Sequence, residues 1–166
     1  GQAIPGAGPS ACRQRRALGV VLRAKAHQQI DEARPLVEAL RGSGAEVTVV
    51  SDGFGLTVHE VCEAIGLRVI SNRVDWGTGR LEFPYEDRCC ACSSCGTCKQ
   101  APVKAASQAG KKTVLVGDGA SDRKAALLAD VVFAKDGLAN WCSTNNLEFL
   151  PFEGLRDVQQ ALLGTQ

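Results

Sequence analysis

The stretch TVLVGDGASD, residues 113–122, decides the fold of this 166-residue chain. Its first four residues are apolar or β-branched, as in the buried strands of a parallel sheet. Two aspartates, Asp118 and Asp122, enclose a glycine-containing loop, and the following RKAALLA predicts a helix. A strand, a loop and a helix in this order predict one unit of an α/β fold, with a candidate site at the carboxyl end of the strand.

The rest of the chain shows the same alternation of strands and helices. EVTVV, residues 46–50, predicts a second buried strand, and SDGFG, residues 51–55, predicts a loop that opens another helix. LRVISNRVDWGTGRLEFPY, residues 67–85, predicts a β-hairpin, and RCCACSSCGTCKQ, residues 88–100, is a cysteine-rich loop before a helix. The pattern predicts an α/β, Rossmann-like parallel sheet flanked by helices, with the hairpin and the cysteine-rich loop inserted.

The first 28 residues lack this regularity. Residues 1–11 suggest a flexible lead, and RQRRALGVVLRAKAH, residues 13–27, suggests a basic helix or a remnant. We therefore expect a flexible or remnant N-terminal segment over residues 1–28 and a core domain over residues 29–166.

Composition and charge exclude several classes of protein. A net charge of +1 gives no electrostatic basis for binding nucleic acid or an anionic membrane. No apolar run approaches the roughly 20 residues that span a bilayer, and no signal peptide is recognisable. Eight cysteines in a chain of this length do not suggest a small disulfide-stabilised protein, so a reduced, cytoplasmic setting is expected.

The two aspartates of GDGASD predict a magnesium site. Asp118 and Asp122 would repel each other at close range, and a hard divalent cation relieves that repulsion. Ser51, at the end of the other predicted strand, could hold a phosphate oxygen together with the backbone N–H groups of Asp52 and Gly53. Each residue also has a purely structural interpretation, with Asp122 and Ser51 as helix caps and Asp118 as a turn former.

Lys99 opens the helix that is predicted after the cysteine-rich loop. A helix N-terminus favours anions, so a lysine there is unfavourably placed for the helix dipole. The position suits a lysine that meets a phosphate, and a solvated lysine is the alternative interpretation.

The order of these elements resembles that of a known family. A serine after a buried strand, then a lysine, then a strand with G-D-x-x-x-D, is similar to motifs two, three and four of the haloacid dehalogenase-like phosphatases. Three runs resemble the phosphoserine phosphatase-like branch and its methionine-salvage members. They are CGTCK (residues 95–99), VGDGASDRKAALLADVVFAKDGLANWC (residues 116–142) and FLPFEGL (residues 149–155). The resemblance covers about residues 30–163.

The resemblance implies a Mg²⁺-dependent phosphomonoester hydrolase that acts on a small phosphorylated metabolite. Ser51 would bind the phosphate with the backbone of Asp52 and Gly53, and Lys99 would neutralise the phosphate and the nucleophile. Asp118 would ligate Mg²⁺, and Asp122 would support the metal shell or orient Lys99. In the family an aspartate attacks phosphorus, and water then hydrolyses the aspartyl-phosphate.

One motif of the family is absent from this sequence. The nucleophile belongs to D-x-D-x-[TV] on the first strand, and no two aspartates here have that spacing. We therefore expect the first strand and the helical cap to be missing or reduced, with an exposed gap beside residues 113–117. An incomplete sequence and a degenerate domain are the two hypotheses, and negligible phosphatase activity is predicted for the chain as written.

The cysteine-rich loop supports a rival interpretation. Cys89, Cys92, Cys95 and Cys98 are spaced C-x2-C-x2-C-x2-C, and four thiolates could bind structural zinc. An iron–sulfur cluster fits less well, because the last gap is shorter than in ferredoxins. Free thiols or a loop disulfide are further alternatives. A non-catalytic domain that binds phosphate or a protein partner is the last one.

Overall fold

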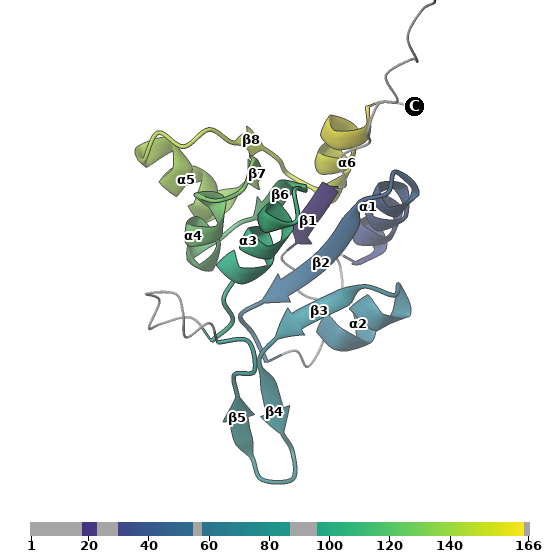
Figure 1. The fold of residues 1–166 in the computed structure, drawn as a ribbon, viewed down its shortest axis with the longest axis vertical. Coiled ribbons are helices and arrows are strands. Elements are labelled where there is room, and N and C mark those ends of the chain that lie inside the picture. The colour runs from purple at the N-terminus through teal and green to yellow at the C-terminus, as the bar shows by residue number, and fades with distance from the viewer. Residues whose placement is uncertain (1–17, 23–29, 55–57, 87–95, 165–166) are drawn as a thin grey trace, which may run out of the picture.

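The computed structural model describes residues 18–22, 30–54, 58–86 and 96–164. Its strands are β1 (Leu18–Leu22), β2 (Glu46–Ser51), β3 (Arg68–Ser71), β4 (Arg73–Asp75), β5 (Arg80–Glu82), β6 (Lys112–Gly117), β7 (Val131–Ala134) and β8 (Leu150–Pro151). Six of them form a parallel sheet in the order β3-β2-β1-β6-β7-β8 (Figure 1). β4 and β5 form an antiparallel hairpin that projects beyond the sheet.

Helices cover both faces of the sheet. They are α1 (Ile30–Gly42), α2 (Val58–Ala64), α3 (Gln100–Gln108), α4 (Arg123–Ala126), α5 (Asp136–Thr144) and α6 (Leu155–Leu163), with a 3₁₀ turn, η2 (Ala120–Asp122), before α4. α1, α2 and α6 pack on one face, and α3, α4 and α5 on the other. The predicted fold class, a parallel α/β sheet flanked by helices, is confirmed. The hairpin predicted over residues 67–85 is confirmed for residues 73–82, whereas residues 68–71 form β3 of the parallel sheet.

Two apolar clusters form the core, one on each face of the sheet. Val49 of β2 packs in one cluster with Leu40 of α1 and Val158 of α6. Leu115 of β6 packs in the other cluster with Leu138 of α5. All five side chains are buried. Successive strand residues point to opposite faces, and both faces of β6 are covered, so TVLV is buried without a polar alternation.

The first strand is present, contrary to the expectation from the sequence. β1 lies between β2 and β6, with Leu22 level with Val49 on one side and Val116 on the other (Figure 1). The gap expected beside β6 is therefore filled. LGVVL is short, apolar and β-branched at two positions, and a central place in the sheet satisfies its backbone groups on both sides.

The prediction of a basic helix over residues 13–27 is therefore wrong for residues 18–22, which form a strand. Gly19 in this strand allows α3 to approach closely, since a Cβ there would lie 3.1 Å from the Cβ of Ala106. The remainder of the predicted segment 1–28 lies outside the described residues. β1 belongs to the core sheet, so the core includes residues 18–22, ahead of the boundary expected at residue 28. The loss of the cap stays a prediction.

Candidate active site

Three strands deliver polar residues to one edge of the sheet. Ser51 is the last residue of β2, Asp118 directly follows β6, and Asn72 directly follows β3. All three are buried. Because the strands are parallel, their carboxyl ends meet at the same edge, where open α/β sheets bind ligands. The structure thus places the predicted Ser51 and Asp118 together at this edge.

The loop after β2 turns back over the side chain of Ser51. The backbone N–H of Gly53 donates a hydrogen bond to Ser51 Oγ over 3.2 Å. The hydroxyl hydrogen can then be donated to another acceptor, such as a phosphate oxygen. α2 begins only at Val58, so Ser51 is not its N-cap, and that structural interpretation of Ser51 is wrong.

Lys99 immediately precedes α3, and its ammonium group is buried. Nζ lies 2.5 Å from Asp122 Oδ1 and donates to Ser121 Oγ over 2.8 Å. Lys99 is 4% exposed and Asp122 is 1% exposed. Two charges withdrawn from water in this way require each other. The interpretation of Lys99 as a solvated lysine is therefore wrong, and Asp122 is placed to orient it.

Asp122 also holds the loop that contains Asp118. Its Oδ2 accepts hydrogen bonds from the backbone N–H groups of Asp118, at 3.2 Å, and Gly119, at 3.0 Å. The carboxylate fits against the backbone because residue 117 is a glycine, since a Cβ on Gly117 would lie 2.8 Å from Asp122 Cγ. Both carboxylate oxygens have protein partners, and this favours the orienting role of Asp122 over direct metal ligation.

A hydrogen-bond network joins the loop of Ser51 to the loop of Lys99. The Thr97 N–H donates to Asp52 Oδ1 over 3.0 Å, and Thr97 Oγ1 donates to Asn72 Oδ1 over 2.8 Å. Asn72 Nδ2 donates in turn to the carbonyl oxygen of Asp52 over 2.9 Å. Lys99 follows shortly after Thr97 in the chain, so the ends of β2 and β3 fix the segment that carries it.

Sequence reasoning missed Asn72, Thr97 and the carboxylate of Asp52. The dipeptide Ser71–Asn72 was interpreted only as part of a hairpin, although it follows a predicted strand as Asp118 does. That position is the signal that could have identified it. Ser71, next to Asn72, links the end of β3 to α2, because its Oγ lies 2.8 Å from Nε2 of His59.

A cavity of about 380 Å³ adjoins this network on the side of the hairpin. Phe54, Val74 and Trp76 line it with apolar atoms, and His59 and Asn72 line it with polar ones. Phe54 belongs to the loop that follows Ser51. An organic group attached to a phosphate at that loop could therefore extend toward the hairpin.

The donors at this edge fit Mg²⁺ with a single protein carboxylate. Asp118 is the carboxylate that could hold the ion, and Mg²⁺ commonly completes its octahedron with waters and phosphate oxygens. Within the described ranges, no three His, Cys, Asp or Glu residues are grouped as a metal site. Cys89, Cys92 and Cys95 lie outside those ranges and Cys98 is buried beside α3, so the zinc prediction stays untested.

None of the helices in the part of the chain that the structure describes has the length and apolar character needed to cross a membrane. No family model matches the chain.

Curated relatives and solved structures do resemble it. The chain is 28% identical over 131 residues to the 2-hydroxy-3-keto-5-methylthiopentenyl-1-phosphate phosphatase of Bacillus velezensis, an alignment that covers 76% of this chain and 56% of that protein. It is 30% identical over 119 residues to the protein of the same name from Bacillus thuringiensis, covering 69% and 54%. The chain therefore spans just over half the length of these relatives.

Phosphoserine phosphatases share its fold. An apo-form crystal structure superimposes with a TM-score of 0.52 and 25% identity, over 77% of this chain and 64% of the other. A phosphoserine phosphatase described as a phospho-aspartyl intermediate analogue superimposes with a TM-score of 0.56 and 24% identity, over 78% and 62%. The resemblance inferred from the motifs is confirmed by these two kinds of comparison.

Proposed function

We propose that this chain, a relative of the phosphoserine phosphatase-like branch of the haloacid dehalogenase-like phosphatases, carries the phosphate- and Mg²⁺-binding part of their active site. The ligand is a small phosphorylated metabolite, bound as a phosphate monoester at the carboxyl edge of the sheet. The complete reaction of the relatives is phosphomonoester hydrolysis, and this chain supplies the residues that bind and neutralise the phosphate.

The buried Lys99–Asp122 pair is the observation that carries this proposal. An ammonium group has three hydrogens, and Asp122 and Ser121 receive two of them, so one can be donated to a phosphate oxygen. Phosphoryl transfer depends mainly on positioning and on charges arranged in advance. A lysine held by a salt bridge and by a hydrogen-bonded loop meets that requirement.

Ser51 and Asp118 complete the proposed binding site. Ser51 Oγ and the backbone of Asp52 and Gly53 would bind phosphate oxygens. Asp118 would hold Mg²⁺, and the ion would neutralise charge on the phosphate when bound. These assignments agree with the positions of the side chains at one edge of the sheet.

The nucleophile is the missing part. The chain continues from β1 as RAKAHQQ, and no carboxylate occurs before Asp31. Aspartyl-phosphate chemistry requires an aspartate at the end of this strand, so we expect negligible hydrolysis by this chain.

A non-catalytic, phosphate-binding domain is the second candidate function. It is favoured by the position of β1, which already fills the place between β2 and β6. A strand supplied by a longer sequence would have to displace β1.

Binding and turnover are tested separately. Isothermal titration with inorganic phosphate and with p-nitrophenyl phosphate, with and without Mg²⁺, measures binding, and release of p-nitrophenol measures turnover. We expect Mg²⁺-dependent binding that weakens about tenfold in Ser51→Ala and in Asp118→Asn, as for the loss of one charge-assisted hydrogen bond or ligand. Ser143→Ala, which removes a hydroxyl from the far helix α5, is the matched control and should bind as the wild type does.

Two results would overturn the proposal in different ways. Absence of saturable binding of either ligand in the presence of Mg²⁺ would refute the phosphate site. Mg²⁺-dependent release of p-nitrophenol well above the buffer rate would refute the inference that the chain lacks a nucleophile.

A further inference from the structure

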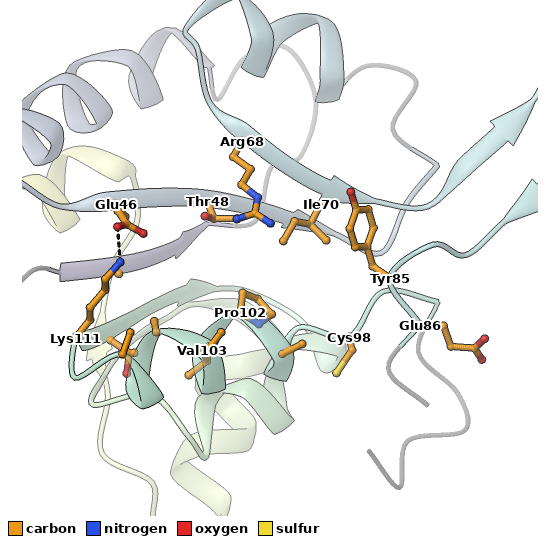
Figure 2. Close-up of a pocket in the computed structure, with 16 residues that line it drawn as sticks. Glu46, Thr48, Arg68, Ile70, Tyr85, Glu86, Cys98, Pro102, Val103 and Lys111 are labelled. Carbon is orange, nitrogen blue, oxygen red and sulfur yellow. Dashed lines mark hydrogen bonds and ion pairs between the residues drawn. The ribbon is translucent and has the colours of Figure 1, made fainter. Parts of the chain in front are cut away.

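A second cavity, of about 520 Å³, lies between the sheet and α3. Residues of β2 and β3 form one wall, and the helix forms the other (Figure 2). α3 packs over β1 and β6, so this side of β2 and β3 carries no helix in the described parts of the chain. Parallel sheets normally have both faces covered. Among the described residues, this part of the sheet is lined by a cavity instead of a helix. We name this cavity the α3 groove.

The walls of the α3 groove are largely apolar. Ile70 of β3 and Val103 of α3 are 7% and 1% exposed, and Pro102 and several alanines of α3 continue the helix wall. Tyr85 stands at one end, where its carbonyl oxygen accepts a hydrogen bond from the Cys98 N–H over 3.1 Å. A volume of this size, bounded on two sides, is in the range of small-molecule sites.

Arg68 provides the positive charge in the middle of the α3 groove, and Glu86 adds a carboxylate at the end beside Tyr85. Figure 2 shows the side chain of Arg68 reaching from β3 across β2 toward Thr48. Among the described residues, the guanidinium has neither an ion-pair partner nor a hydrogen bond. At the far end of the groove, Lys111 and Glu46 form an ion pair, so their charges nearly cancel. The middle of the groove is thus positive between apolar walls.

We propose that the α3 groove binds a small organic anion with an apolar body. The guanidinium of Arg68 presents two parallel N–H donors to a carboxylate or a phosphate, and Thr48 Oγ1 can add a third donor. The body lies along Ala101 and Ala105, exposed alanines of α3 that line the groove, where it displaces water from apolar surface. This site is separate from the proposed phosphate site and does not rest on it.

Titration of ¹⁵N-labelled protein with octanoate, octyl phosphate and octanol, followed by amide chemical shifts, tests the proposal. The first two probes distinguish the head groups, and octanol measures the apolar body alone. We expect saturable shifts in β2, β3 and α3 with at least one of the two anions. The affinity of the Arg68→Gln variant for that anion should be about tenfold lower or more, while its weak binding of octanol stays unchanged. Arg156→Gln, on the exposed face of α6, is the matched control and should behave as the wild type does.

A second variant tests the cavity without changing its charge. Ala105→Phe fills the helix wall at an exposed position and should abolish binding of the anion. Ser51→Ala should leave it intact, which separates this site from the phosphate site. Equal affinity in Arg68→Gln and the wild type, octanol binding as tight as the anions, or no saturable shift in the groove would each overturn the proposal. A dimer in light scattering that Ala105→Phe dissociates would also overturn it, because a second copy of the chain would then be the occupant.

Discussion

Replacing Asp122 by asparagine tests whether the buried Lys99–Asp122 pair holds the candidate site together. The substitution preserves the shape of the side chain and removes the carboxylate that lies 2.5 Å from the ammonium of Lys99. Lys99, 4% exposed, then loses its counter-charge while it is still out of water. Removing one partner of a buried pair costs about 3–5 kcal/mol. We expect the free energy of unfolding to fall by about that amount, out of the 5–15 kcal/mol typical of a domain.

Asp157 provides a matched control for the backbone part of this effect. Asp157 Oδ2 accepts hydrogen bonds from the N–H groups of Gly154, at 3.0 Å, and Glu153, at 2.9 Å. This is the same pattern that Asp122 makes in its own loop, but Asp157 is exposed and has no lysine in contact within the described residues. The excess loss in Asp122→Asn over Asp157→Asn therefore measures the contribution of the buried charge pair.

Urea denaturation at pH 7, followed by circular dichroism, gives both free energies of unfolding from the midpoints and slopes. Thermal melts should show Asp122→Asn lower by roughly 6–20 °C, at 2–4 °C for each kcal/mol in a chain of this size. Equal losses in the two variants would refute the reasoning. The double variant Lys99→Met/Asp122→Asn should recover part of the stability, because it removes the uncompensated charge.

Three further predictions follow from local geometry. Gly117→Ala should lower the free energy of unfolding by about 1–3 kcal/mol in urea titrations, because its Cβ would overlap the fixed carboxylate of Asp122. Hydrogen bonds from the N–H groups of Gly154 and Glu153 lower the pKa of Asp157. Its stabilising effect should therefore be complete above about pH 4 and disappear as the pH falls further, so acid unfolding curves of Asp157→Asn and the wild type should converge at low pH. Burial raises the pKa of the Cys62 thiol, so mass spectrometry after alkylation at pH 8 should find Cys62 modified only when urea is added.

The carboxyl edge of the sheet could be predicted because it depends on connectivity alone. Once EVTVV and TVLV are recognised as parallel strands, the residues after them must meet at one edge, whatever the detailed packing. Ser51 and Asp118 were found in this way. β1 could not be predicted, because the basic residues on both sides of LGVVL make the whole run of residues 13–27 resemble a helix in composition. Its strand conformation depends on pairing with β2 and β6, which are distant in sequence.

The contacts that link the loops could not be predicted either. Asp52, Asn72 and Thr97 lie on three different loops, and their hydrogen bonds depend on side-chain positions that no periodicity encodes. Asp52 in particular resembles an ordinary loop aspartate in the sequence. The side chain of Asn72 packs closely against the backbone of Gly96, since a Cβ on residue 96 would lie 2.7 Å from Asn72 Nδ2.

Phosphate binding and nucleophilic attack depend on different parts of this fold. The bond of Thr97 to Asp52 and the pair of Lys99 with Asp122 are made between the loops that follow β2, β5 and β6. These contacts can keep their geometry without a nucleophile, and folding alone would require Lys99 and Asp122 because breaking their pair costs so much stability. Their presence therefore does not by itself distinguish an enzyme from a binding domain. Ser51 takes no part in that salt bridge, so the effect of changing it on phosphate affinity is the more direct measure of function.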